Sequence, residues 1–170
     1  MQFQKGSDEA FEKLYLEFGN EIKKYLYFMT NNEALSLDIS QEVWIKVINK
    51  KDSLKTPAAF KQWLYRIAKN TYFNHFNKNK KEIIETNLEE ITSESTDDDI
   101  LINQEDLSIV QKIIYELPED KRTILWLRFV ENYTSQEIAK IMKIPIGTVR
   151  SRLHYVIKEI KQLATSGETK

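Results

Sequence analysis

An acidic segment in the middle of the chain most constrains its fold, because it divides the sequence into two basic parts. Residues 82–106 contain ten Asp and Glu residues and no Lys or Arg. Residues 1–81 carry a net charge of +5 (14 Lys/Arg, 9 Asp/Glu), and residues 107–170 carry +4 (11 Lys/Arg, 7 Asp/Glu). A segment with little apolar content and charges of one sign is typical of a linker. We therefore predict domains at 1–81 and 105–170, joined by a linker at 82–104.

The two basic parts show apolar residues at helical spacing and no strand-like alternation. Glycine and proline are scarce, at four and three residues, which also favours helices. The sequence therefore predicts an all-α fold of two small helical domains. We expect helices over residues 8–29, 36–49, 57–80 and 105–117, one opening at Pro118, one starting at Thr134 and one over 146–163.

Composition also limits the classes of function. There is no cysteine, which excludes disulfides and cysteine-bound metals and suits a reducing cytoplasm, where we expect the protein. No apolar run approaches the ~20 residues that would insert into a membrane. The two histidines, His75 and His154, are far apart in sequence, and there is no phosphate-binding glycine loop. We therefore predict no enzyme, no catalytic residue, no metal and no cofactor.

The segment FKQWLYRIAKNTYFNHFNKNKK, residues 60–81, holds six aromatic and six basic residues and no acidic one. On a helix, one arc that includes Phe60 and Leu64 is apolar and is interpreted as a core face. The opposite arc interleaves aromatic and basic side chains, a pattern suited to stacking on unpaired bases and holding phosphates. The alternative is that a neighbouring helix covers this arc. Its members are Lys61, Tyr65, Arg66, Lys69, Tyr72, Phe73 and Phe76.

Residues 133–158, YTSQEIAKIMKIPIGTVRSRLHYVIK, predict a helix-turn-helix. Thr134 and Glu137 form a capping box that starts its first helix, and MKIP makes the turn. The second helix shows short polar side chains near its start, which would let its backbone approach base edges. Its neighbouring basic residues would reach guanines or phosphates. The alternative is an ordinary helical hairpin with a solvated charged face.

The segment 36–49 has a wide apolar arc and an acidic ridge. The ridge contains Asp38, Gln41 and Glu42, with Ile45 among them. An acidic ridge is poorly placed for DNA, so it is either a surface for another protein or a solvated face. The residues alone favour the solvated face.

Taken together, these segments resemble the extracytoplasmic-function (ECF) sigma factors of bacterial RNA polymerase, in the sigma-70 family. DISQEVWIKV at 38–47 resembles the polymerase-docking helix, and FKQWLYRIAKN at 60–70 resembles the helix that melts and reads the −10 element. LPEDKRTILWLRFVENYTSQEIAKIMKIPIGTVRSRL at 117–153 resembles the domain that reads the −35 element. The resemblance implies transcription initiation at −35/−10 promoters with core RNA polymerase, commonly under an anti-sigma factor.

The resemblance also implies roles for matched residues. The polymerase contacts, to the β′ clamp helices with the β subunit as a further partner, would be Asp38, Gln41, Glu42 and Ile45. The loop Asn49–Pro57 would capture a flipped base of the non-template −10 strand. That strand and the adjoining duplex would meet Tyr65, Arg66, Lys69, Tyr72 and Phe76. The −35 major groove would receive Thr148, Arg150, Ser151, Arg152 and His154.

The chain departs from the family at two places. Lys143 stands in the turn where the family often has glycine, and a left-handed backbone there would cost lysine about 1 kcal/mol. After Leu153 the sequence HYVIKEIKQ is less basic than is usual in the family, which weakens the expected hold on −35 phosphates.

The sequence is also compatible with two other classes of protein. A stand-alone helix-turn-helix regulator would bind duplex DNA without polymerase, as a dimer on paired half-sites. An all-helical interaction protein would use only the acidic ridge and would not show the salt-dependent DNA binding of a basic surface.

Overall fold

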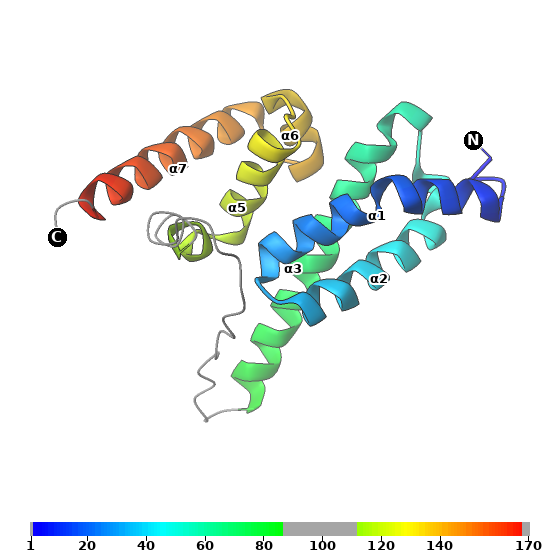
Figure 1. Cartoon of the computed structure of the whole chain (residues 1–170), viewed down its shortest axis with the longest axis horizontal. Helices are drawn as coiled ribbons and strands as arrows, with labels where there is room; N and C mark the ends of the chain where they lie inside the picture. Colours follow the sequence, from blue (N-terminus) through cyan, green and yellow to red (C-terminus); the bar gives the residue numbers. More distant parts are fainter. Residues whose placement is uncertain (1, 87–111, 168–170) are drawn as a thin grey trace.

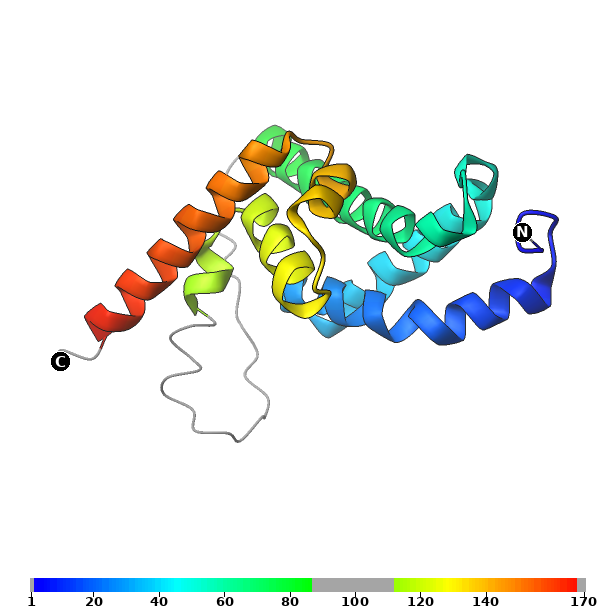
Figure 2. The same ribbon diagram turned by 90° about the horizontal axis from the view of Figure 1, so that it is seen from above.

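The computed structural model describes residues 2–86 and 112–167. All regular structure in these two stretches is helical, which confirms the predicted all-α class. The N-terminal domain (α1–α3) and the C-terminal domain (residues 112–167) pack against each other, and the last helix, α7, runs away from the N-terminal domain (Figures 1 and 2). The predicted linker at 82–104 lies outside the described residues except at its start, where α3 continues.

The N-terminal domain consists of three helices and two short turns of 3-10 helix. Ser7 accepts a hydrogen bond from the Ala10 N–H and begins the first helix, as expected of an N-cap serine. The third helix extends beyond the end predicted near residue 80. The elements are α1 (Asp8–Thr30), α2 (Glu33–Asn49), η1 (Lys51–Ser53), η2 (Pro57–Ala59) and α3 (Phe60–Thr86).

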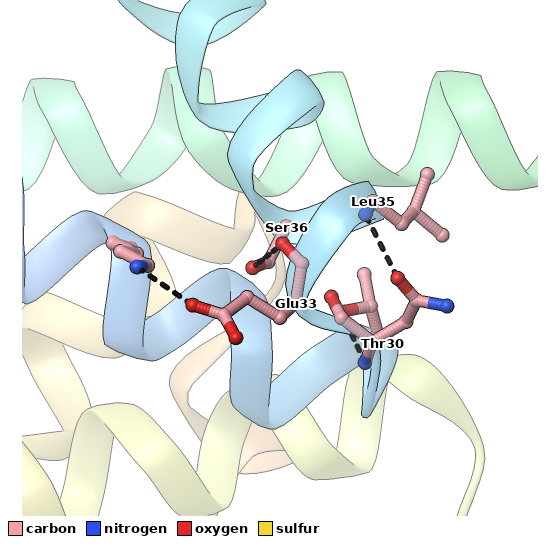
Figure 3. Close-up of polar contacts among 6 residues, drawn as sticks. Thr30, Glu33, Leu35 and Ser36 are labelled. Carbon is pink, nitrogen blue, oxygen red and sulfur yellow. Dashed lines mark hydrogen bonds and ion pairs between the residues drawn. The ribbon is translucent and has the colours of Figure 1, made fainter. Parts of the chain in front are cut away.

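Polar contacts define the turn between α1 and α2 (Figure 3). The Asn32 side chain accepts a hydrogen bond of 2.9 Å from the Leu35 N–H and caps α2. The Thr30 hydroxyl accepts one of 3.2 Å from the Asn32 N–H, and the Ser36 hydroxyl donates one of 2.7 Å to the Glu33 carbonyl. These contacts orient α2, and with it the acidic ridge.

The C-terminal domain contains the predicted helix-turn-helix. Residues 112–116 are helical, and the helix expected to open at Pro118 begins at Glu119. The Thr134 hydroxyl accepts from the Glu137 N–H while the Glu137 carboxylate accepts from the Thr134 N–H, which confirms the capping box. The elements are α5 (Glu119–Leu125), the π-helical turn η3 (Trp126–Val130), α6 (Ser135–Met142) and α7 (Ile146–Gly167).

The apolar core runs through both domains without a break. Leu64 of α3 and Leu127 of η3 are completely buried members of the same cluster. Aromatic rings connect the domains, with Phe28 and Trp126 only 5.0 Å apart between ring centroids. Small domains bury a limited fraction of their surface, so shared burial stabilises both.

The turn of the helix-turn-helix has the left-handed backbone that the family resemblance suggested at this position. Lys143 ends α6 at φ 56° and ψ 45°. We expect Lys143→Gly to raise the free energy of unfolding by about 0.5–1 kcal/mol, because glycine adopts this conformation without steric strain. Lys143→Ala is the control, since it removes the charge and keeps the strain. Equal unfolding free energies for the two variants in urea titrations would contradict this explanation.

Candidate nucleic-acid interface

The first turns of α7 present the residues expected in the −35 groove to solvent. Arg150, Ser151 and His154 are exposed, and Thr148 is half-buried. The Ser151 hydroxyl donates to the Thr148 carbonyl at 3.1 Å, which is a local helical contact that water or a base could replace. Arg152 forms an ion pair with Asp120 of α5, which holds its guanidinium beside the start of that helix.

The backbone of this helix is also accessible. A Cβ atom built on Gly147 would meet nothing within 4 Å. Val149 and Leu153 on the opposite side are buried, so packing on α6 fixes the orientation of α7. The arrangement suits insertion of an α-helix into a major groove, with polar and basic side chains toward the bases.

The acidic ridge of α2 lies on an open surface. Asp38, Gln41 and Ile45 are exposed, and Ile45 retains 58% of its surface. Glu42 is half-buried and pairs with Lys46 at 2.5 Å. The structure therefore brings the four predicted residues together on one side of α2.

The ridge adjoins an apolar groove that the sequence analysis missed. The groove has a volume of about 240 Å³ between α1 and α2, and Tyr15, Leu16 and Leu37 line it. Leu16 is the most exposed of these, at 73%. The sequence carried one indication, since Leu16 is an apolar residue outside the helical spacing of Phe11, Leu14, Phe18 and Ile22. Exposed apolar residues beside a polar ridge are typical of a protein-binding surface.

The loop after α2 is held in place by contacts from both sides. The Gln4 side-chain amide donates to the Lys51 carbonyl at 3.2 Å and to the Leu54 carbonyl at 2.7 Å. The Trp63 indole N–H of α3 donates to the Ser53 hydroxyl at 3.0 Å. Sequence reasoning missed Gln4, since its partners lie far along the chain. The loop is thus a fixed surface feature beside the start of α3.

The aromatic-basic arc of α3 is not the open surface that its helical pattern predicted. Tyr65 is only 1% exposed and Tyr72 only 4%. Both domains cover them, because α1 and α6 pack on α3 and the Tyr72 hydroxyl bonds both the Met29 carbonyl of α1 and Arg122 of α5. The Tyr65 ring lies 5.5 Å from Tyr25 and 6.1 Å from Tyr133 between centroids. The expectation of outward-facing rings is therefore wrong for this conformation, and the alternative of a covering helix holds. Contact of these residues with DNA stays a prediction.

Three further residues of the arc, Lys69, Phe73 and Phe76, lie at the margin of the covered area. Phe76 is 44% exposed and stacks on Tyr72 at 6.2 Å. Lys69 is half-buried, and its ammonium lies 5.6 Å from the centroid of the Phe73 ring. Burial, with further contributions from nearby Lys143 and Arg66, lowers the pKa of Lys69. Basic side chains from both domains therefore gather at this margin.

Arg122 of α5 is the central polar residue of the contact between the domains. It is 8% exposed. Its guanidinium donates to the Met29 carbonyl at 3.1 Å and to the Tyr72 hydroxyl at 3.3 Å. Met29 lies in the last turn of α1, which has no basic residue of its own. Arg122 thus supplies the cation that a helix C-terminus favours.

An ion-pair cluster reinforces a second part of this contact. The Lys61 ammonium lies 2.8 Å from the Glu131 carboxylate of the C-terminal domain and 3.0 Å from that of Glu21. Partial burial alone would lower the pKa of Lys61, but its bonds to the two carboxylates raise it to about 12. Lys61 is therefore charged at neutral pH and engaged within the protein.

Within residues 2–86 and 112–167, no helix is both long and apolar enough to cross a membrane. The same stretches contain no group of three or more His, Asp or Glu side chains placed to hold a metal ion.

A helix-turn-helix with an open polar and basic face, joined to a second helical domain, is the arrangement of a DNA-binding protein. Comparison with known families agrees, since residues 14–82 match Sigma-70 region 2 and residues 107–160 match Sigma-70, region 4. The RNA polymerase sigma-H factor of Pseudomonas aeruginosa is 30% identical over 161 residues, covering 88% of this chain and 83% of that protein.

Two further relatives lead to the same group. The ECF RNA polymerase sigma factor SigW of Bacillus subtilis is 30% identical over 164 residues, covering 90% of this chain and 88% of that protein. The ECF RNA polymerase sigma-E factor of Escherichia coli is 31% identical over 161 residues, covering 88% and 84%. The chain therefore belongs to the ECF sigma factors of the sigma-70 family, which act in transcription initiation.

Solved structures share the fold. The sigma factor RpoE in complex with the anti-sigma factor NepR from Bartonella quintana superposes with a TM-score of 0.74 at 19% identity, covering 92% of this chain and 98% of that one. CnrH in complex with the cytosolic domain of CnrY gives 0.70 at 16% identity, covering 97% and 94%. The likeness confirms the two-domain helical architecture over most of the chain.

Proposed function

We propose that this sigma factor reads the −35 element with α7 and the −10 element with α3 and the loop Asn49–Pro57. The observation that carries the proposal is the open face of α7, where Arg150 and Ser151 stand on a capped helix-turn-helix. Arginine bonds guanine bidentately in the major groove, and short side chains permit close approach. Tyr65, Arg66, Lys69, Tyr72 and Phe76 contact the −10 strand once the C-terminal domain has moved off α3.

We further propose that the domains comprise residues 1–81 and 105–170, with the linker at 82–104. The region 2 match over 14–82 and the region 4 match over 107–160 support this division. Because α3 continues to Thr86, the helical part of the first domain extends into the segment assigned to the linker.

The polymerase-binding surface, in this proposal, combines the ridge of α2 with the neighbouring groove. The polymerase partner is the pair of β′ clamp helices, and the β subunit meets the C-terminal domain. Ile45, Leu37 and Leu16 supply exposed apolar area, while Asp38 and Gln41 supply polar contacts at its edge. Interfaces commonly have this composition of an apolar centre and a polar rim.

Ile45→Asp should weaken binding to core polymerase by tenfold or more, because a new charge would lose its hydration in the centre of the interface. Folding should be unaffected, since Ile45 is 58% exposed. Tyr27→Asp, which changes another exposed residue of the same domain at 47%, is the matched control. Fluorescence anisotropy with labelled core polymerase measures both, and equal affinities would contradict the assigned surface.

We also propose that an anti-sigma protein regulates this chain and that it acts in the cytoplasm, where polymerase and DNA are found. The two solved neighbours were each determined with a bound partner, NepR described as an anti-sigma factor and CnrY through its cytosolic domain. Affinity purification from the native host, followed by mass spectrometry, tests the proposal. Recovery of polymerase without any other stoichiometric protein would count against it.

The function as a whole is tested by run-off transcription. Purified protein is mixed with bacterial core polymerase and fragmented genomic DNA, and the transcript starts are sequenced. We expect starts that share upstream −35 and −10 elements. Duplex binding without polymerase, and no transcripts, would instead favour a stand-alone helix-turn-helix regulator.

A further inference from the structure

The N-terminal turn, residues 2–7, lies against the loop Asn49–Pro57, to which the proposed function assigns capture of a flipped −10 base (Figures 1 and 2). We propose that Gln4 in this turn is a positioning residue for −10 recognition, because its side-chain amide fixes the backbone shape in which the loop receives that base. The inference rests on the proposed function, since a fixed shape serves recognition only if the loop meets promoter DNA. Residues 2–7 precede the Sigma-70 region 2 match, which begins at residue 14.

The turn that carries Gln4 is itself fixed on two helices. Gly6 has a left-handed φ of 86°, and its N–H donates to the Phe3 carbonyl at 3.0 Å, which reverses the chain. Phe3 is only 3% exposed, and its ring centroid lies 6.0 Å from that of Phe11 in α1 and 6.2 Å from that of Phe60 in α3. Gln4 therefore reaches the loop from a fixed support, so that little conformational freedom remains to be lost in its contacts.

The side-chain amide of Gln4 bonds two backbone carbonyls of the loop. An amide NH2 group has two hydrogens to donate, and this one donates to the Lys51 carbonyl at 3.2 Å and to the Leu54 carbonyl at 2.7 Å. Lys51 begins η1 and Leu54 caps its end, so a single side chain spans the whole turn. These partners lie 47 and 50 positions from Gln4 in sequence. The contact therefore fixes the loop relative to the start of the domain.

The opposite side of the loop is fixed by α3, while its outer surface stays open. The Trp63 indole N–H donates to the Ser53 hydroxyl at 3.0 Å, and the Leu54 side chain is buried in the core. The polar side chains of the loop that remain exposed include Asp52, Lys55 and Thr56. The two fastenings thus hold the backbone and leave polar side chains at the surface, where a base can meet them.

A fixed backbone matters for selecting one base among four. A site rejects the wrong base when its hydrogen-bonding groups stay in place and are left without partners, and the rejection is lost when those groups can move. A loop that is ordered before DNA arrives also avoids the entropic cost of ordering on binding. Loss of the Gln4 contacts should therefore reduce discrimination among bases, which a general loss of stability would not do.

Gln4→Glu tests the proposal, because a carboxylate has nearly the shape of the amide and no hydrogen to donate to the two carbonyls. Gln2→Glu is the matched control, since Gln2 is an exposed glutamine of the same turn and the change adds the same charge. Each full-length protein is combined with core polymerase in run-off transcription. The templates derive from one promoter that the wild type uses and carry each of the four bases in turn at every −10 and −35 position.

The measured quantity is the preference for the cognate base at each position. We expect Gln4→Glu to lower this preference by about tenfold within the −10 element and to leave the −35 preferences unchanged, while Gln2→Glu keeps all wild-type preferences. Unchanged −10 preferences in Gln4→Glu, or an equal loss of transcription from every template, would overturn the proposal and leave the sigma-factor function intact. Absence of any −10 preference in the wild type would refute the proposed role of the loop, and the inference with it.

Amide hydrogen exchange examines the loop without DNA. The N–H groups of Ser53 and Leu54 are both bonded to carbonyls of the same loop, so their exchange should be about tenfold faster in Gln4→Glu. Peptides from α1 and α2 should exchange as in the wild type, and Gln2→Glu should match the wild type throughout. Unchanged exchange over residues 49–57 in Gln4→Glu would contradict the role of Gln4. Equally faster exchange throughout the N-terminal domain would show general destabilisation in place of positioning, and would also overturn the proposal.

Discussion

Arg150→Ala should lower transcription from a cognate promoter by about 5- to 150-fold. A well-formed contact between arginine and guanine contributes about 1–3 kcal/mol of discrimination in the major groove. Arg150 is exposed in the second turn of α7, and alanine is a strong helix former. The loss should therefore come from DNA contact and not from unfolding.

Lys158→Ala is the matched control, because Lys158 is an exposed cation on the same helix, farther from its N-terminus. Both variants are compared in run-off transcription on a promoter with an intact −35 element and on one with that element scrambled. Arg150→Ala should lower transcription only from the promoter with the intact −35 element. An equal loss on both templates would show that Arg150 acts outside −35 recognition.

Tyr65→Ala should reduce transcription by about tenfold or more, because stacking of one base on an aromatic ring is worth about 1–3 kcal/mol. The same substitution empties space beside Tyr25 and Tyr133. Loss of a buried aromatic side chain commonly costs about 3–5 kcal/mol. The core of the N-terminal domain, through Tyr25, and its contact with the C-terminal domain, through Tyr133, should therefore weaken at the same time as the contact with DNA.

Tyr65→Phe separates these effects. Phenylalanine keeps the ring for stacking and removes a buried hydroxyl that lies beside the Glu131 carboxylate and the Trp126 indole N–H without well-formed hydrogen-bond geometry to either. We expect near wild-type transcription and an unfolding temperature at least as high as that of the wild type. Binding to a forked promoter fragment in the presence of polymerase, with circular dichroism as a check of folding, gives the comparison. A tenfold loss of transcription in Tyr65→Phe would show that the hydroxyl, and not the ring, makes the essential contact.

Local chemistry was sufficient to predict most helix boundaries. The capping box at Thr134, the helix after Pro118 and the core face of α3 all depend on residues within one or two helical turns of each other. The left-handed backbone at Lys143 was suggested by the resemblance, because the family often has glycine at that position of the turn. The exposed ridge of α2 and the open face of α7 also follow from helical periodicity.

Contacts between distant residues decided the rest. Aromatic and basic side chains on one arc suit stacked bases and an apolar partner helix equally well, so periodicity could not tell which of the two covers Tyr65 and Tyr72. Arg122 binds the Met29 carbonyl across 93 positions of sequence, and nothing around it in the chain indicates that partner. The exposure of Leu16 depends on how α1 packs on α2. Which surfaces of this sigma factor are open and which are closed is therefore a property of the packed domains, since burial is set by neighbours that the linear pattern does not specify.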